Sequence, residues 1–393
     1  MSPDTFRQRT ERIQAALTAH SLDAYVTFDP QETYYITGFA PILYSHPIAA
    51  IITTTSDPAL VVWANRGPYA RRSASAPIIS TYGRWAGETG APDVASAIAS
   101  ALEQLELSAG STIGYDPAKT LVESLESVRA AVAGRRIVPV SQLIDRVRSV
   151  KDSGELEAAR DAAVLTRVGM AAAQQEAGRR TTELAVAVAA MTAMQAYWVS
   201  HFPHRASWSF ASSQVGAFNA LWAYCLSGER VALNSAPPST APIRDGDLCW
   251  VVIFATLDGM HVELERTFAI GELPPERDAA YRALIEINER GRDSLRPGVS
   301  CQQVYDRLAG LYRELGYGQY LPGRIGHGVG LGQHEWPSLG PTDATVLEPG
   351  MLLTYEPNLR IPSFGGLQHS DTVLITDDGY EFVTDYARGF VEV

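Results

Sequence analysis

The sequence has few cysteines and no long apolar run. Its three cysteines, Cys225, Cys249 and Cys301, stand well apart in a chain of 393 residues, so we expect neither a disulfide framework nor a zinc-binding cysteine motif. No uninterrupted apolar stretch has the length that a transmembrane helix needs. The polar N-terminus also lacks the apolar core of a signal peptide. These features predict a soluble, cytoplasmic protein that does not act at a membrane.

Positive charge is also scarce. The chain has 32 Lys and Arg residues against 44 Asp and Glu residues, which gives a formal net charge of −12 at pH 7. A nucleic-acid-binding surface needs a surplus of basic side chains, so we expect no nucleic-acid partner. With 46% hydrophobic and 19% charged residues, the composition is typical of a globular protein with a substantial core. The chain length favours two domains.

The first 150 residues alternate between strand and helix patterns. Short runs rich in apolar and β-branched residues predict strands, and apolar residues at helical spacing predict the helices between them. The predicted strands are 24–28, 47–54, 58–64, 111–116 and 136–140, and the predicted helices include 94–107 and 121–133. This alternation predicts an α/β domain over residues 1–150, built around one sheet.

The pattern changes near residue 150. A long Ala-rich helix ends before Gly178, and a second helix begins after Thr181 and Thr182. Two β-rich runs meet at Asp258-Gly259, which is a strong hairpin signal. Helices at 276–293 and 301–315 and a final set of strands follow. We therefore predict an α+β domain over 151–393, with an antiparallel sheet flanked by helices.

Histidines and carboxylates gather on the strands and Gly-rich loops of this second domain. Glu263 and Glu265 alternate along one predicted strand and so share a face. Internal ion pairs with Arg266, Arg324 and Arg360 would be a purely structural explanation. Charges on apolar strands are costly to bury unless they are paired, liganded or used, so the whole set favours a functional pocket. The set comprises Glu263, Glu265, His327, His334, Glu356, His369 and Asp371.

These residues lie in segments that resemble a known superfamily. GHGVGLGQHEWP and YEPNLRIPSFGGLQHSDTVLIT resemble the GHGIG…HExP loop and the EPGIY…GGVRIEDTVLVT segment of the pita-bread superfamily. That superfamily includes aminopeptidase P, prolidase, methionine aminopeptidase, creatinase and ectoine hydrolase. ETYYITGF (32–39) and RVRSVKDSGELEAAR (146–160) resemble its N-terminal domain and linker more loosely. The resemblance implies a creatinase-like N-terminal domain over 1–150 and a pita-bread catalytic domain over 151–393.

The resemblance also shows where this chain departs from the peptidases. Those enzymes hold two metal ions on two Asp, one His and two Glu residues. The corresponding positions here are Val252, Glu263, His327, Glu356 and Ser370. Because two dications in one site need bridging carboxylates, Val252 and Ser370 exclude a binuclear centre. A single metal on Glu263, His327 and Glu356, with His369 as a further ligand, stays open as an alternative.

Creatinase, the metal-free branch, offers the nearer site pattern. HVELERTF resembles its ALERT element, which implies Glu265, Glu356 and His327 as catalytic residues with no metal and no cofactor. The resemblance further implies a homodimer whose shared sites receive Tyr44 and His46 from the partner chain. The superfamily's acid/base histidine, expected near Ser235, is missing, since the nearest histidines are His204 and His261. Acid/base chemistry would then fall to Glu265, Glu356, His327 or His334.

We expect aromatic residues in the segment 204–225 to form one wall of the pocket. Alternatively, these residues belong to the core or make contacts in a dimer. The predicted substrate-binding residues are Tyr44, His46, Trp208, Trp222, Glu263, His334 and His369. The sequence thus predicts a metal-independent hydrolase or lyase that acts on a C–N bond of a small amidine, amide or cyclic substrate. The alternatives are a metal-dependent Xaa-Pro dipeptidase or aminopeptidase with degenerate ligands, and an inactive ligand-binding relative of the peptidases.

Overall fold

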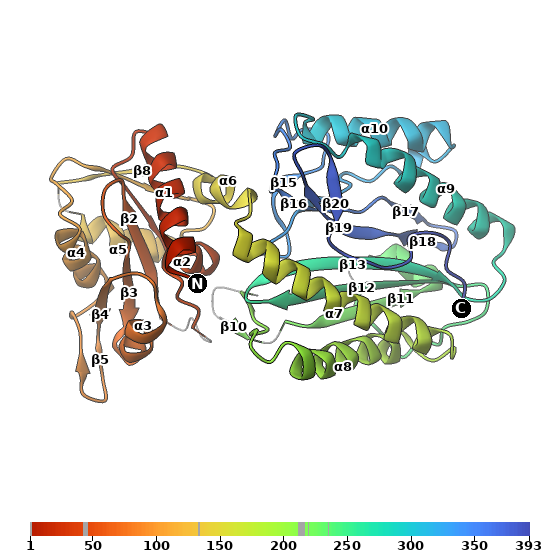
Figure 1. Ribbon diagram of the computed structural model, residues 1–393, viewed down its shortest axis with the longest axis horizontal. Coiled ribbons are helices and arrows are strands. Elements are labelled where there is room, and N and C mark those ends of the chain that lie inside the picture. Colours follow the sequence, from red (N-terminus) through yellow and green to blue (C-terminus); the bar gives the residue numbers. More distant parts are fainter. Residues whose placement is uncertain (1, 42–45, 133, 211–216, 219, 235) are drawn as a thin grey trace. The chain divides into compact units, whose positions relative to one another are not determined.

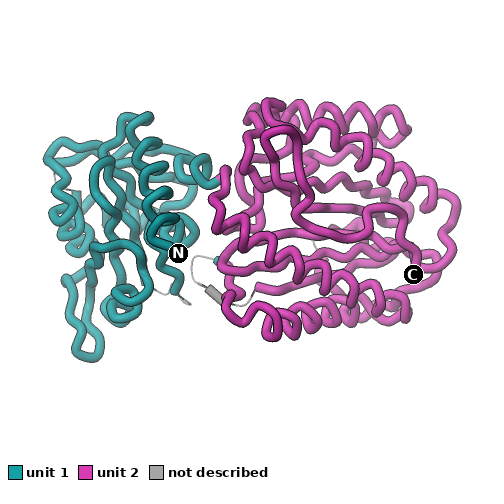
Figure 2. Tube along the Cα trace, in the orientation of Figure 1, with its two compact units in different colours: residues 1–148, 210–218 teal, residues 149–209, 219–393 magenta. Residues whose placement is uncertain are grey.

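The structure is a computed structural model that describes residues 2–41, 46–132, 134–210, 217–218, 220–234 and 236–393 (Figure 1). The chain divides into two compact units, which Figure 2 colours separately. The first comprises Met1–Arg148 and Phe210–Phe218, and the second comprises Ser149–Ser209 and Asn219–Val393. The structure differs from the predicted boundaries in the segment 210–218, which belongs to the first unit. There the Phe210 ring lies 5.8 Å from the ring of Tyr34, a contact that local sequence patterns do not encode.

The first unit is an α/β domain around a six-stranded sheet. The strand order is β4-β3-β2-β1-β7-β8, and β1 pairs antiparallel with β2 and parallel with β7. These strands are β1 (Ala24–Thr27), β2 (Ala49–Thr53), β3 (Ala59–Trp63), β4 (Ile78–Tyr82), β7 (Thr112–Tyr115) and β8 (Arg136–Pro139). Its helices are α1 (Pro3–Ala19), α2 (Pro30–Thr37), α3 (Gly67–Ser73), α4 (Val94–Gln104) and α5 (Val122–Ala131).

Helix α4 shows why these residues form these elements. The Asp93 side chain caps the helix by accepting a hydrogen bond from the backbone N–H of Ser96. Its buried residues recur at helical spacing, at Ala97, Ile98, Ala101 and Leu102, and they join the core of the sheet. The α/β architecture predicted for the N-terminal domain is therefore confirmed.

The second unit is built on a curled antiparallel sheet. Its strand order is β11-β12-β13-β19-β16-β14-β15, with β20 paired to β19. The strands are β11 (Trp222–Ser227), β12 (Leu248–Leu257), β13 (Met260–Ala269), β14 (His327–Gly328), β15 (Glu335–Ser338), β16 (Leu352–Tyr355), β19 (Ser370–Ile375) and β20 (Tyr380–Phe382). The predicted hairpin joins β12 to β13, and both turn residues have positive φ, 47° at Asp258 and 85° at Gly259. A second hairpin pairs β17 (Asn358–Ile361) with β18 (Gly365–Gln368).

Helices flank this sheet, as predicted. They are α7 (Ser153–Ala177), α8 (Glu183–His201), α9 (Pro275–Gly291) and α10 (Cys301–Glu314), and α6 (Leu143–Ser149) precedes them. Helix α7 starts with a capping box formed by Asp152 and Glu155 and runs along β12 and β13 (Figure 1). Side chains alternate along β12, so Ile253 reaches Gly169 of α7 while Val252 and Phe254 point to the opposite face. That opposite face carries the candidate site.

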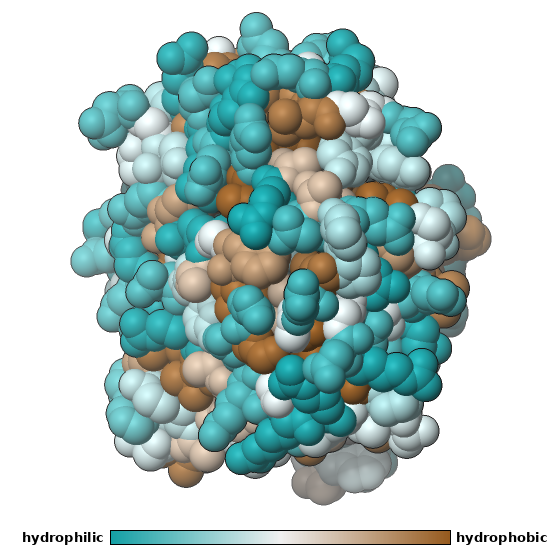
Figure 3. Space-filling model, turned by 90° about the vertical axis from the view of Figure 1, so that its right-hand side faces the viewer, coloured by the Kyte–Doolittle hydropathy of each residue, from teal (hydrophilic) through white to brown (hydrophobic). Residues whose placement is uncertain are grey.

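The face of the second unit shown in Figure 3 is largely hydrophilic, with separate apolar areas between the polar ones. Among the helices in the described ranges, none combines the length and the apolar character needed to cross a membrane.

Candidate active site

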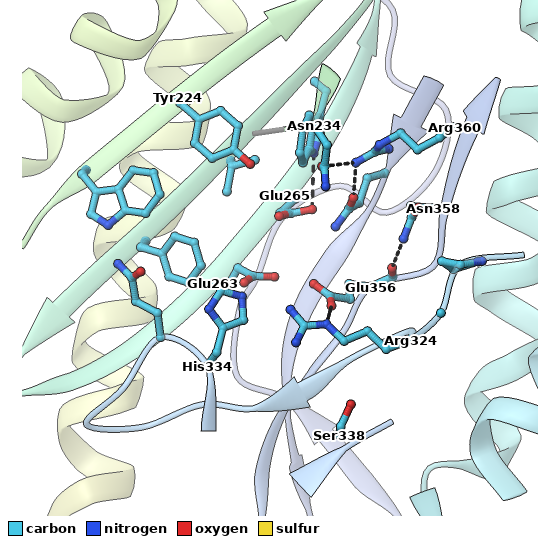
Figure 4. A pocket seen from close by; sticks show the side chains of 18 residues that line it. Tyr224, Asn234, Glu263, Glu265, Arg324, His334, Ser338, Glu356, Asn358 and Arg360 are labelled. Carbon is cyan, nitrogen blue, oxygen red and sulfur yellow. Dashed lines mark hydrogen bonds and ion pairs between the residues drawn. The ribbon is translucent and has the colours of Figure 1, made fainter. Parts of the chain in front are cut away.

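An open cavity of about 740 Å³ lies in the second unit, on the sheet face turned away from α7 and α8. Strands β11, β12 and β13 supply one wall (Figure 4). The loop around Arg324 and His334 and the hairpin β17–β18 supply the facing wall, from which Arg324, Asn358 and Arg360 extend. The cavity therefore draws residues from segments more than 100 positions apart in the sequence.

Strand register decides which side chains meet in the cavity. Tyr224, Val252, Glu265 and Ser370 occupy matching positions on four neighbouring strands, β11, β12, β13 and β19. Side chains paired directly across antiparallel strands have Cβ atoms about 4.5–5.5 Å apart. This cross-strand row therefore places one carboxylate, that of Glu265, between the uncharged side chains of Val252 and Ser370.

Glu263, His327 and Glu356 converge at the base of the cavity. His327 Nε2 lies 3.6 Å from Glu263 Oε2 and 3.7 Å from Glu356 Oε2. His327 Nδ1 is 2.9 Å from the Gly328 carbonyl oxygen, which can only accept, so Nδ1 carries the proton. Nε2 is then buried without a hydrogen-bond partner among the described residues. The Ser370 hydroxyl donates to Glu263 Oε1 at 2.5 Å and fixes that carboxylate.

Burial and mutual charge separate the pKa values of these groups. Burial raises the pKa of Glu356 to about 7, although His327 opposes the shift. Burial and the charges of Glu263 and Glu356 raise the pKa of Glu265 well above its usual range. For Glu263, burial is outweighed by His327 and Ser370, so its pKa lies below the usual value. Glu263 is thus the ionised member of the group near neutral pH.

The two cavity histidines shift in opposite directions. Burial favours the neutral form of His327, but the carboxylates of Glu356 and Glu263 outweigh it, so the His327 pKa is raised. Burial and the nearby His327 lower the pKa of His334 to about 4. The ring centroids of the two histidines are 4.2 Å apart. His334 is therefore neutral at pH 7 and can offer one hydrogen-bond donor and one acceptor to a group in the cavity.

The raised pKa of Glu356 predicts a pH-dependent effect on stability. The pKa is about 7 in the folded chain against a reference value of 4.5. When folding raises the pKa of a carboxyl group, the protonated group is compatible with the folded chain at a pH below its unfolded-state pKa. Stability is then lost as the pH rises through the folded-state pKa, because the buried group must ionise. We expect Glu356→Gln to raise the free energy of unfolding by about 1–3 kcal/mol at about pH 8 and by little at about pH 5. Urea titrations in the presence of chelator measure the free energy of unfolding at each pH. An equal effect of the substitution at the two pH values would contradict the raised pKa of Glu356.

The donor set fits one divalent cation and does not fit two. Two carboxylates and an imidazole offer ligand atoms within 4.8 Å of one another, and the unpartnered His327 Nε2 faces them. Oxygen and imidazole nitrogen donors suit several divalent metals. Val252 offers no donor atom, and the Ser370 hydroxyl is already committed to Glu263. The resemblance to the peptidases places metal ligands at positions 252 and 370. In this structure neither residue has a donor atom that is free to bind a second ion.

The structure brings several predicted site residues together and leaves others apart. Glu263, Glu265, His334, Glu356 and Trp222 all line the cavity. His327 lies beside them, with Nε2 directed at two of these carboxylates. The proposed roles of these residues stay predictions.

Two other predicted residues do not belong to the lining. His369 packs edge-on against Tyr281, with Nε2 3.2 Å from the Tyr281 hydroxyl, because alternation along β19 gives the cavity-facing position to Ser370. The prediction that His369 binds substrate or metal is therefore corrected. The Trp208 ring lies against Gly259 at the β12–β13 turn, so it packs on the hairpin and does not form a cavity wall.

The prediction of shared sites in a homodimer concerns the N-terminal domain. His46 stacks on Trp63 within the first unit, with ring centroids 4.6 Å apart. Tyr44 lies outside the described residues. The homodimer and the contribution of these two residues to a partner's site remain predictions.

Sequence reasoning missed much of the cavity wall. Tyr224, Trp250 and Phe254 line it beside Trp222, and Arg324 and Arg360 face it. The signal was present in the alternation of aromatic residues on β11 and β12, at 222, 224, 250 and 254. Alternation alone does not say which face of a strand borders a cavity, and the residues on both faces of β12 are buried.

Comparison with known proteins agrees with this fold. Residues 157–377 match the family model described as metallopeptidase family M24, and residues 9–150 match the creatinase/prolidase N-terminal domain. The chain is 26% identical over 384 residues to a Xaa-Pro dipeptidase from Pyrococcus furiosus, covering 97% of this chain and 99% of that protein.

Solved structures show the same architecture. A Xaa-Pro dipeptidase from Bacillus anthracis superposes with a TM-score of 0.83 and 21% identity, covering 99% of this chain and 100% of the other. The dipeptidase PepE from Mycobacterium ulcerans gives a TM-score of 0.83 and 21% identity, covering 100% and 99%. The chain therefore belongs to metallopeptidase family M24, as a hydrolase with a creatinase/prolidase-type N-terminal domain.

Proposed function

We propose that this chain hydrolyses an amide-type C–N bond of a small substrate in the cavity, assisted by one divalent cation. The observation that carries the proposal is the convergence of Glu263, His327 and Glu356 around the unpartnered Nε2 of His327. The relatives named Xaa-Pro dipeptidase support amide hydrolysis as the reaction class. This reading favours the metal-dependent alternative over the metal-free hydrolysis predicted from the sequence.

Each residue of the cavity would have a distinct role in this hydrolysis. When bound, a single divalent cation polarises a carbonyl oxygen and makes water a better nucleophile at neutral pH. Glu263, His327 and Glu356 would hold it, with Ser370 orienting the Glu263 carboxylate. His334, whose pKa is lowered to about 4, would stay neutral and would hydrogen-bond to water or substrate in the same cavity. Arg324, 3.7 Å from Glu356 and half-exposed, would offer positive charge to an anionic substrate group at the mouth.

One observation favours metal-free hydrolysis as a second candidate function. Burial brings the pKa of Glu356 to about 7. A carboxyl group with such a pKa can both take up and release a proton near neutral pH. In this alternative, Glu356 replaces the acid/base histidine that the sequence lacks, and no cation is required.

Metal content separates the two candidates. We expect dialysed protein to retain about one equivalent of Mn²⁺, Co²⁺ or Zn²⁺ by elemental analysis, because the site offers one set of donors. His327→Ala should lose it, whereas His201→Ala, at the exposed end of α8, should retain it. Release of free amine from a panel of dipeptides and N-acyl amino acids is followed by mass spectrometry, with and without chelator. Two equivalents of metal would overturn the single-cation site, and hydrolysis that survives chelation would establish the metal-free candidate.

A further inference from the structure

We propose that Lys151 is a positioning residue, which fixes the loop 329–334 and thereby holds the His334 side chain at its place in the cavity. The inference rests on the proposed function in one respect, since it takes His334 to hydrogen-bond to water or substrate during hydrolysis. Lys151 does not line the cavity itself. It acts through the carboxylate of Glu335, the residue that follows His334 in the chain.

The loop 329–334 carries two cavity residues on a backbone rich in glycine. It joins β14 to β15 and has the sequence Val-Gly-Leu-Gly-Gln-His. Glycine loses more conformational freedom on folding than any other residue, so this backbone is costly to fix. Gln333 and His334 line the cavity, and His334 extends into it (Figure 4). The loop therefore needs contacts from other segments to keep these two side chains in place.

The Glu335 carboxylate makes such a contact with each of its oxygens. Oε1 accepts a hydrogen bond from the Gly332 N–H at 2.8 Å, and Oε2 accepts one from Lys151 Nζ at 2.9 Å. The side chains of Lys151 and Glu335 are only 2% and 7% exposed. Charge-assisted hydrogen bonds are short and strong, and burial shields this one from water. Without the ammonium group, the buried carboxylate would turn toward water and release the Gly332 N–H.

The backbone at Gly330 lies directly against this ion pair. A Cβ atom at Gly330 would lie 2.7 Å from Glu335 Oε2 and 2.9 Å from Lys151 Nζ, which is closer than real Cβ atoms approach other groups. The Gly330 carbonyl oxygen accepts hydrogen bonds from the backbone N–H and from Nδ1 of His261, each at 2.7 Å. The ion pair and strand β13 therefore hold the same residue of the loop, and the ion pair extends this hold to Gly332.

A buried ion pair can also stabilise a fold without positioning any cavity residue. The sequence contains a second lysine, Lys119, and no others, which provides an internal comparison. Lys119 pairs with Glu32 at 2.9 Å and with Asp145 at 2.5 Å in the first unit, and none of the three lines the cavity. Removal of either lysine should therefore cost stability. Only removal of Lys151 should displace His334.

Hydrogen–deuterium exchange on the full chain tests the order of the loop without requiring turnover. We expect Lys151→Met to raise the exchange rate in peptides that cover 329–335 by about tenfold, because the Gly332 N–H loses its fixed acceptor. Glu335→Gln should raise it by a similar factor. The double variant should exceed neither single variant, since all three remove one contact. Lys119→Met should leave the exchange of this loop unchanged.

Kinetics on the amide substrate that the panel identifies test the link to His334. We expect Lys151→Met to lower kcat/KM by about 10–100-fold, the usual effect of misplacing a group in an active site. Lys119→Met should leave kcat/KM within about twofold of the wild-type value. In a His334→Asn background the positioned ring is already absent, so Lys151→Met should cause no further loss.

The outcomes separate the two proposals. Unchanged exchange at 329–335 in Lys151→Met overturns the positioning role, and so does an equal rise in Lys119→Met. A rate loss that is as large in the His334→Asn background as in the wild type overturns it as well. If Lys151→Met does not fold by circular dichroism, Glu335→Gln decides by the same measurements. If no amide is hydrolysed but exchange rises at the loop alone, the proposed function is wrong and the positioning role stands. Hydrolysis at the full rate by Lys151→Met does the reverse.

Discussion

Replacing Glu356 with glutamine is expected to lower kcat/KM by about 10²–10⁴-fold while leaving the fold intact. In the proposed mechanism this change removes one of three donors to the cation. In the metal-free candidate it removes the group that exchanges the proton. Because Glu356 has a necessary role in both, the prediction holds whichever candidate is correct. Glutamine keeps the size of the side chain, so the packing around β16 should not change.

The measurement is the initial rate on whichever amide substrate the panel identifies, together with the circular dichroism spectrum. Glu348→Gln is the matched control, because Glu348 is an exposed glutamate in the turn before β16 and does not line the cavity. It should keep the wild-type rate. A Glu356→Gln variant with a full rate would place the chemistry outside this cluster.

Replacing Arg266 with methionine is expected to lower the free energy of unfolding by about 3–5 kcal/mol. The Arg266 side chain is fully buried and pairs with Asp371 at 2.9 Å. It also donates to the carbonyl oxygens of Glu265, Ser370 and Ala387. Methionine would leave the Asp371 carboxylate at 1% exposure with one remaining ion pair, to Arg388. Leaving one partner of a buried pair uncompensated is the costly case.

Urea unfolding followed by fluorescence measures this loss. Arg282→Met is the matched control, because Arg282 makes an exposed pair with Asp278 one turn away on α9. Exposed pairs of this kind contribute about 0–1 kcal/mol, so this variant should unfold near the wild-type midpoint. A loss for Arg266→Met no larger than that for the control would mean that the buried network does not hold β13 and β19 together.

Much of the fold followed from local patterns in the sequence. Apolar runs predicted five of the six strands in the sheet of the first unit, all except β4, and the Asp258-Gly259 pair predicted the β12–β13 hairpin, because few residues tolerate positive φ. The Ala-rich pattern ending before Gly178 predicted helix α7, whose capping box at Asp152 and Glu155 is seen in the structure. These signals are short-range, since hydrogen bonding and backbone strain within a few residues decide them. Helix α2, over Pro30–Thr37, was missed because its eight residues carry almost no amphipathic pattern.

The Glu263, His327 and Glu356 cluster was accessible from the sequence, and so were Glu265, His334 and Trp222, but the rest of the cavity wall was not. Motif resemblance located Glu263, His327 and Glu356, because family motifs preserve spacing along the chain. It could not show that Tyr224 shares a cross-strand row with Glu265 and Trp222 one with Glu263, since that depends on the register of β11 against β12 and of β12 against β13.

Likewise, the sequence could not show that His369, directly before β19, packs against Tyr281 and not in the cavity. The sequence by itself determined the architectures of the two domains and the hairpin through interactions between near neighbours, and motif resemblance pointed to Glu263, His327 and Glu356. Only the tertiary structure decided that the Ser370 hydroxyl reaches Glu263 while His369 packs against Tyr281, and that Tyr224 shares a cross-strand row with Glu265. Both depend on side chains that pack across strands from distant segments, and no local free-energy preference encodes them.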